Sequence, residues 1–331
     1  MHFASGNEFT PVGKDGLAAL SPLIVHSRDP EKCPNLLIFA HGLNGHRYKT
    51  WGDFPKFLFE DRTDIDVGLY SYASGWQRWS KMDSTTLVVH ARELADTIRD
   101  SHYRSVVLVG HSMGGLLCKA TIKDLIESQT HCSDGSLAVD RVSGLVLMGT
   151  PQAGSMRVPQ ILTPFFTDAR ALKAHSPLIE SLNSVFLDRV CVDPSQFDAR
   201  KYLIPTYAVL GTSDKWVDAF SGGMNIGRDY KKTVRGSHSE IVKPGNREDK
   251  AYKWFREAVS WCFSNHFPPE RGAASGNVNS GTETSDTSEA FRVGGLDIRL
   301  GKQVLSRPFS IEISQNKDIK INVDLPEGGS Q

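Results

Sequence analysis

Short apolar runs alternate with stretches of helical periodicity along most of this chain. Each run is nearly continuous in apolar residues and ends in glycine or polar residues, which is typical of strands buried on both faces of a sheet. We therefore expect strands at 20–27, 35–42, 64–74, 104–110, 142–151 and 203–212.

Four segments between and after these runs carry apolar side chains at helical spacing. In residues 84–100 the apolar positions recur every three or four residues, and Ser84 is suited to cap the first turn. Strands that alternate with helices predict the α/β class, with a mostly parallel central sheet flanked by helices. The expected helices lie at 51–61, 84–100, 116–128 and 246–265.

One long segment interrupts this alternation. Residues 152–200, between two predicted strands, are rich in Pro, Phe and Leu, which predicts a helical cap-like insertion beside the sheet. Its apolar side chains suit an acyl chain, although such residues more often pack cap helices together. The clearest of them are Ile161, Leu162, Phe165 and Phe166.

The composition changes again near the C-terminal end. Residues 268–290 are rich in Gly, Ser, Thr, Asn and Glu without apolar periodicity, which predicts a flexible linker. Residues 291–331 alternate apolar and polar positions and predict a short β-rich C-terminal extension. We expect the extension to pair with the main domain, a second copy or a protein partner. The remaining residues, 1–267, form the expected catalytic domain.

Charge and cysteine content narrow the class of protein. Lys plus Arg equals Asp plus Glu at 38 each in a chain of 331 residues, so no long-range field favours nucleic acid or an anionic membrane. The five cysteines are scattered and lack metal-ligand spacing, as in reduced cytosolic proteins. With no signal peptide and no apolar stretch of about 18 residues, we expect a cytoplasmic protein without a transmembrane segment. No nucleotide-binding or metal motif is present, so no cofactor and no metal are expected.

The segment between two of these elements carries the strongest chemical motif. Gly110-His111-Ser112-Met113-Gly114 fits G-x-S-x-G and sits between the strand 104–110 and the helix 116–128. A nucleophile elbow requires this order, because a sharp strained turn lifts the serine above the sheet at a helix N-terminus. Ser112 is therefore the predicted nucleophile.

A serine nucleophile needs a base and an acid, in the chain order Ser, Asp, His. Asp214 follows the strand 203–212, and His238 lies in a loop before the last helix. Asp214 is expected to orient His238, whose other ring nitrogen takes the Ser112 proton. Asp218 lies one helical turn further on and is an alternative acid, although Asp214 is closer to the strand end.

The same chemistry needs donors for the oxyanion. The N–H of Met113, directly after the nucleophile, is one expected donor. The other is the N–H of Leu43, in the Gly-rich stretch His41-Gly42-Leu43-Asn44-Gly45 that follows the strand 35–42.

Four stretches of this sequence resemble the α/β-hydrolase superfamily, in particular the lipase-like serine esterases of the DUF676 or "serine active site containing" type. The resemblance implies an α/β-hydrolase fold over about residues 20–265, and it implies the same nucleophile, base, acid and oxyanion donors. Related domains act as effectors in immune-receptor-like proteins, which implies that a partner can regulate such a hydrolase. The stretches are FAHGLNGHRYKTW at 39–51, VGHSMGGLLCK at 109–119, MGTPQAGS at 148–155 and HSEIVKP at 238–244.

Two classes of function remain open from the sequence. The first is an enzyme that hydrolyses a small-molecule or lipid carboxylic ester through an acyl-enzyme, and the same residues would serve a thioesterase or an amidase. The second is a partner-regulated effector or binding module with little turnover of its own. An intact set of site residues favours the enzyme.

Overall fold

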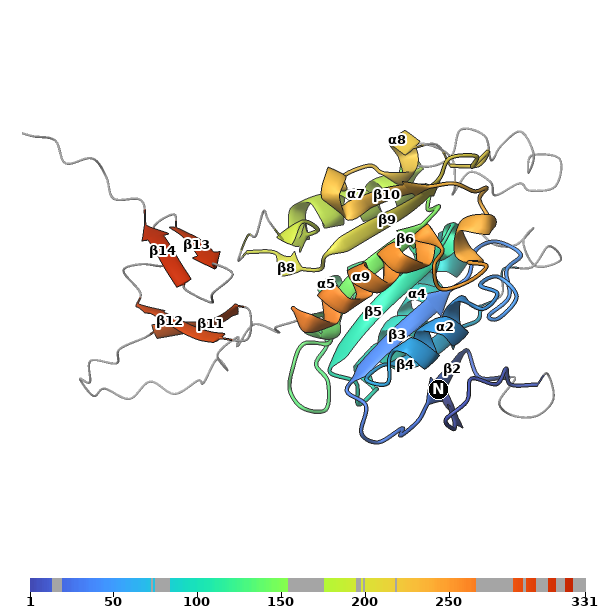
Figure 1. Cartoon of the computed structure of the whole chain (residues 1–331), viewed down its shortest axis with the longest axis horizontal. Coiled ribbons are helices and arrows are strands. Elements are labelled where there is room, and N and C mark those ends of the chain that lie inside the picture. The colour runs from blue at the N-terminus through green and yellow to red at the C-terminus, as the bar shows by residue number, and fades with distance from the viewer. Residues whose placement is uncertain are drawn as a thin grey trace, which may run out of the picture. The chain divides into compact units, whose positions relative to one another are not determined.

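The computed structural model describes the main body of the chain and four strands near its C-terminal end (Figure 1). It divides into two compact units, Met1–Glu270 and Arg271–Gln331. The described residues are 1–13, 20–72, 74, 84–153, 176–194, 198, 200–217, 219–265, 288–293, 296–301, 309–313 and 319–323.

The first unit is built on an eight-stranded sheet in the order β1-β2-β4-β3-β5-β6-β9-β10 (Figure 1). Every neighbouring pair is parallel except β2 with β4, which confirms the predicted mostly parallel sheet. The strands are β1 (His2–Ser5), β2 (Leu23–Ser27), β3 (Asn35–Ala40), β4 (Asp66–Tyr70), β5 (Ser105–His111), β6 (Val142–Met148), β9 (Thr206–Gly211) and β10 (Lys231–Val234).

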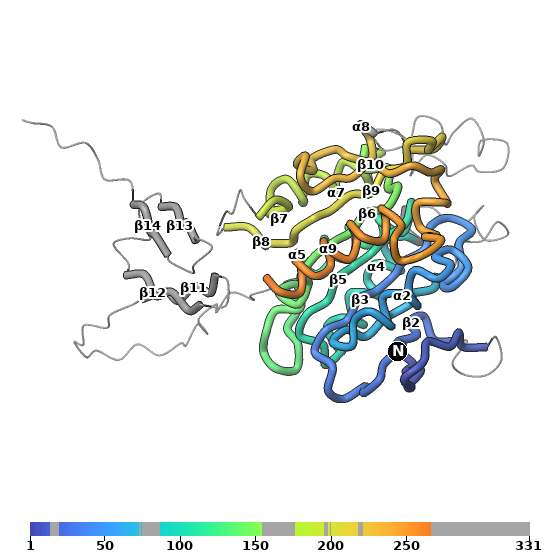
Figure 2. Tube along the Cα trace, in the orientation of Figure 1, coloured from blue at the N-terminus to red at the C-terminus, as the bar shows by residue number. Residues whose placement is uncertain are grey.

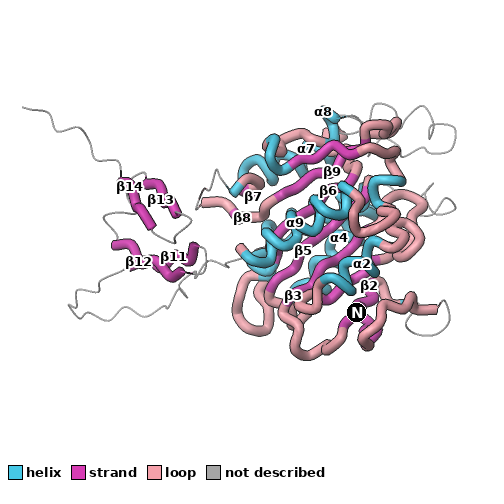
Figure 3. The backbone as a smooth tube through the Cα atoms, viewed as in Figure 1, coloured by secondary structure: helices cyan, strands magenta, loops and turns pink. Residues whose placement is uncertain are grey.

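Helices cover both faces of this sheet (Figure 3). Alternate residues of β3 point to opposite faces, as the pleat requires: Ile38 packs with α4 and α5, whereas Phe39 packs with α2 and α9. Figure 2 shows α9, from the C-terminal end of this unit, on the same side as the early helix α2. The four helices are α2 (Phe54–Asp61), α4 (Ser84–Arg99), α5 (Met113–Ser128) and α9 (Lys250–Ser264).

All six predicted strands and all four predicted helices are present, but the ends of some elements differ from the expectation. The helix expected at 246–265 begins at Lys250, because the side chain of Asp249 accepts the N–H of Ala251 and caps the first turn. The edge strands β1 and β10 were not predicted. In β10 three of the four residues are exposed, so the segment shows no apolar run.

Only part of the predicted cap insertion lies within the described residues. Its helix α7 (Pro177–Arg189) is capped by Ser176, whose side chain accepts the N–H of Ile179. The buried amine of Lys119 on α5 donates to Asn183 Oδ1 of α7 at 2.8 Å and fastens this helix to the body. Smaller elements here are β7 (Val190–Cys191), β8 (Tyr202–Leu203) and α8 (Ala219–Gly222). The side chains expected to suit an acyl chain, Ile161, Leu162, Phe165 and Phe166, lie outside the described residues.

The described residues of the second unit form two antiparallel strand pairs. β11 (Ser288–Val293) pairs with β12 (Leu296–Gly301), and β13 (Phe309–Ile313) pairs with β14 (Ile319–Val323). β11 begins inside the segment expected to be linker, because Ser288 already pairs with Gly301. The bounds of the linker, 268–290, stay a prediction. The partner expected for this extension stays a prediction.

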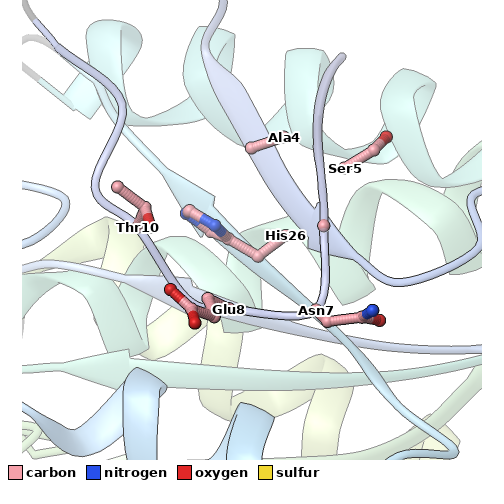
Figure 4. A pocket seen from close by; sticks show the side chains of 7 residues that line it. Ala4, Ser5, Asn7, Glu8, Thr10 and His26 are labelled. Carbon is pink, nitrogen blue, oxygen red and sulfur yellow. The ribbon is translucent and has the colours of Figure 1, made fainter.

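A pocket of about 290 Å³ lies beside β1, and His26 lines it (Figure 4). None of the residues predicted to carry chemistry is among its lining residues. The His26 ring packs against the Phe9 ring in a tilted arrangement, with 4.1 Å between centroids, and its Nε2 lies 3.1 Å from the Tyr48 hydroxyl. The same hydroxyl accepts the N–H of Val12. The pocket is also lined by Ala4, Ser5, Gly6, Asn7, Glu8 and Thr10.

His26 predicts how the stability of the body depends on pH. Burial lowers its pKa to about 4, against about 6.5 in an unfolded chain. Between these values the unfolded state binds a proton that the folded state does not, so acid destabilises the fold by up to about 1.4 kcal/mol per pH unit. In urea titrations from pH 4.5 to 6, His26→Gln is expected to lower the slope of unfolding free energy against pH by about 1 kcal/mol per unit. An unchanged slope would contradict this role.

Candidate active site

The turn between β5 and α5 holds Ser112 in a strained conformation. Its φ of 55° and ψ of −123° lie in a region that side-chain-bearing residues rarely adopt. Hydrogen bonds on both sides hold it there: the Ser112 N–H donates to the Met148 carbonyl at 2.9 Å, and the Gly115 N–H donates to the Ser112 carbonyl at 3.0 Å. The serine thus sits on a sharp strand-to-helix turn, as the motif predicted.

Two glycines of the motif make this turn sterically feasible. A Cβ on Gly114 would lie 2.1 Å from the carbonyl oxygen of Ala40 at the end of β3. A Cβ on Gly110 would lie 2.4 Å from the Cα of Gly115. Because no side chain fits at either position, the turn can pass directly against the neighbouring strand and the start of α5.

The loops after β9 and β10 bring Asp214 and His238 together. His238 Nδ1 lies 2.8 Å from Asp214 Oδ2, so the ring nitrogen donates to the carboxylate. The Asp214 side chain is only 1% exposed and that of His238 is 15% exposed. The histidine therefore keeps an accessible edge while its acid is buried behind it.

Backbone donors fix the other oxygen of the Asp214 carboxylate. Oδ1 accepts the N–H groups of Trp216 at 2.8 Å and Val217 at 3.0 Å. Burial opposes ionisation of this carboxyl, but the hydrogen bond and charge of His238 and these two donors outweigh it, and the pKa of Asp214 lies below its ordinary value. Asp218, the alternative acid, lies outside the described residues.

The strand β6 ends between the elbow and this pair. Met148 accepts from the Ser112 N–H, and the next residue, Gly149, has a φ of 56°. A Cβ on Gly149 would lie 3.1 Å from His238 Nδ1 and 3.3 Å from Asp214 Oδ2. Ser112 Oγ makes no hydrogen bond within the described part of the chain. A hydrogen bond between a serine hydroxyl and a histidine base is often long without substrate and tightens only when substrate is bound.

The loop after β3 lies against Ser112. A Cβ on Gly42 would lie 2.9 Å from the Cβ of Ser112, so this loop and the elbow are in direct contact. The loop is shaped by Asn44, which has a φ of 52° and donates its N–H to the Ser74 carbonyl at 3.0 Å. Among the described residues, the N–H groups of Leu43 and Met113, the two expected oxyanion donors, make no hydrogen bond.

This contact predicts a large effect of a small substitution. Gly42→Ala places a methyl group against Ser112. For the ester hydrolysis that the sequence predicts, kcat is expected to fall about a hundredfold, since displacements of about 1 Å have that effect. The measurement is steady-state hydrolysis of a chromogenic ester. Gly245→Ala is the matched control, because its Cβ would meet no atom within 4 Å. Equal activity of the two variants would contradict the predicted contact.

Sequence reasoning missed several residues that build this site. Trp216 and Val217 act through backbone N–H groups, which carry no side-chain signal. The G-x-S-x-G motif allows any residue at His111, so the motif assigns it no role. Its Nε2 nevertheless lies 2.9 Å from the His238 carbonyl oxygen. The position of His111 at the end of an apolar strand could have indicated a buried polar side chain, which needs a hydrogen-bond partner.

Neither a metal site nor a membrane-spanning helix is found in the described ranges. No group of three or more His, Cys, Asp or Glu side chains there is arranged to hold a metal ion. None of the helices described combines the length and apolar character needed to cross a bilayer.

The comparison with known families agrees with this fold. Residues 37–255, about two-thirds of the chain, match the Alpha/beta hydrolase family. The chain therefore belongs to that family.

Curated relatives include Protein SERAC1 of Homo sapiens, 25% identical over 288 residues, which covers 75% of this chain and 42% of that protein. Protein SERAC1 of Danio rerio is 25% identical over 277 residues, covering 72% and 40% respectively. The chain thus spans less than half the length of the curated relatives it matches.

Solved structures with a similar backbone include a lipase of Bacillus licheniformis, with a TM-score of 0.47 and 13% identity. That match covers 72% of this chain and 97% of the lipase. The phospholipase PlaB of Legionella pneumophila has a TM-score of 0.48 and 14% identity, covering 86% of this chain and 70% of PlaB.

Proposed function

We propose that this chain is a serine hydrolase that cleaves carboxylic esters through an acyl-enzyme intermediate, with Ser112, His238 and Asp214 as its triad. The observation that carries the proposal is the 2.8 Å hydrogen bond from His238 Nδ1 to a buried Asp214 carboxylate, in a chain whose Ser112 occupies a strained strand-to-helix turn. This combination is what nucleophilic catalysis by serine requires.

Acylation begins with a proton transfer. Because Nδ1 of His238 carries the hydrogen donated to Asp214, Nε2 is the basic nitrogen and takes the proton of Ser112 Oγ as that oxygen attacks the acyl carbon. The same Nε2–H then protonates the leaving alkoxide, which departs as an alcohol. The ionised Asp214 stabilises the imidazolium that exists between these two transfers.

Two free backbone donors complete the proposed mechanism. The N–H groups of Leu43 and Met113 would bind the oxyanion that forms as the carbonyl becomes tetrahedral, and removing one such donor typically costs a hundredfold to a thousandfold. Deacylation repeats the sequence with water as nucleophile: His238 removes its proton, and Ser112 leaves with that proton as the acid product is released.

A panel of matched substrates tests the proposed reaction and its leaving group. The panel holds p-nitrophenyl esters of increasing acyl length, the thioester of one of those acids and its p-nitroanilide. Ester turnover above that of the thioester and anilide is expected. Faster thioester or anilide turnover would replace the esterase by a thioesterase or an amidase, and no turnover of any substrate would favour a partner-regulated effector or binding module.

A further inference from the structure

One buried imidazole connects the proposed nucleophile with the main chain of the proposed base. His111 Nε2 lies 2.9 Å from the carbonyl oxygen of His238. Because a carbonyl can only accept, Nε2 must carry the ring hydrogen of His111 and donate it. Nδ1 is therefore the bare nitrogen, and it is buried without a hydrogen-bond partner among the described residues.

The His111 ring is neutral at the pH at which a hydrolase works. Burial, with a smaller effect of the neighbouring His238, lowers the pKa of His111 to about 3. Its single ring hydrogen is directed to the His238 carbonyl, so this contact is a fixed neutral hydrogen bond.

The two ends of this hydrogen bond differ in how firmly the fold holds them. His111 is the last residue of β5, aligned with Met148 of β6, and its ring packs edge-on against the buried Trp51 at 6.2 Å between centroids. His238 lies in a loop between β10 and the short 3-10 turn Glu240–Val242. The hydrogen bond from His111 thus links a loop residue, His238, to the end of a central strand.

We propose that His111 is a positioning residue, whose Nε2–H holds the main chain of His238 so that the imidazole stays between Asp214 and Ser112. The consequence for the reaction rests on the proposed function, but the hydrogen bond itself does not. Residue 111 thereby sets the place of the base while residue 112 supplies the nucleophile, and one strand end fixes both.

The kinetic test compares two substitutions that differ in one hydrogen-bond donor. His111→Leu removes the donor and is expected to lower kcat for a p-nitrophenyl ester about 10- to 100-fold with KM within twofold, because the base is displaced. His111→Gln restores an amide N–H near the position of Nε2 and is expected to retain kcat within about threefold. His26→Leu, a second buried histidine outside the site, is the control for general destabilisation and should leave kcat unchanged.

A spectroscopic readout separates this proposal from the proposed function. The proton between His238 Nδ1 and Asp214 is expected as a downfield proton resonance in the wild type, assigned by its loss in His238→Gln. His111→Leu should lose or broaden this resonance, and His111→Gln should retain it. If the wild type hydrolyses no ester but the resonance follows this pattern, the positioning role stands and the proposed function fails.

Three results would overturn the positioning role: a wild type without the resonance, a His111→Leu enzyme that keeps both resonance and kcat, or equal losses in His111→Leu, His111→Gln and His26→Leu. Equal losses in all three variants would show that replacing any buried histidine lowers activity through general destabilisation.

Discussion

Replacing Ser112 with alanine is expected to lower ester hydrolysis by about a million-fold, to the level of the uncatalysed reaction plus residual oxyanion stabilisation. Alanine keeps the Cβ that the strained turn already accommodates, and Ser112 Oγ makes no hydrogen bond within the described residues. The free energy of unfolding should therefore change by no more than about 0.5 kcal/mol in urea titrations. Loss of turnover with an unchanged fold identifies a missing nucleophile.

The control for this variant is Ser239→Ala. Ser239 is exposed, directly follows the proposed base, and makes no capping hydrogen bond with its side chain. Its alanine variant is expected to hydrolyse esters at the wild-type rate. Residual activity of Ser112→Ala within tenfold of the wild type would show that another group attacks the ester.

Asp214→Asn is expected to lower kcat about ten-thousand-fold at neutral pH while leaving the fold intact. The N–H groups of Trp216 and Val217 hold an oxygen at the Oδ1 position, so the new amide nitrogen would face His238 Nδ1. That nitrogen can only donate, so His238 must accept at Nδ1 and carry its hydrogen on Nε2, where it can no longer take the Ser112 proton.

A comparison of the kcat values of Asp214→Asn and Asp218→Asn tests which of the two aspartates is the triad acid, a choice that the sequence left open. With Asp214 hydrogen-bonded to His238, Asp218→Asn is expected to keep kcat within about threefold of the wild type. Steady-state kinetics of both variants on one ester is sufficient. A large loss in Asp218→Asn together with an active Asp214→Asn would assign the acid to Asp218 instead.

The sequence was sufficient for the central strands of the fold because those strands are buried on both faces. β3 and β5 consist almost wholly of buried residues, so their apolar runs stand out. The G-x-S-x-G motif predicted that β5, Ser112 and α5 follow one another. The motif is informative because only glycine fits at positions 110 and 114, where a Cβ would collide with neighbouring backbone atoms. The family match confirmed the class of protein that these elements imply.

Other features depend on neighbours that a linear sequence does not contain. β10 is a strand because Lys231–Val234 pairs with Ala208–Gly211 at the edge of the sheet, and its own residues lack an apolar pattern. The Asp214–His238 hydrogen bond joins residues 24 positions apart, and the bond from His111 to His238 spans 127 positions. The sequence offered candidates for both ends of the first bond, whereas for the second it could have marked His111 but not its partner.

The central claim, that Ser112 is an activated nucleophile, is tested most directly by covalent labelling. The protein would be treated with a fluorophosphonate, and the adduct located by mass spectrometry of the intact chain and of its peptides, with His238→Ala in parallel. One adduct, on Ser112, is expected in the wild type, and none in His238→Ala at the same time of exposure. An unlabelled wild type, or an adduct on a different residue, would contradict it.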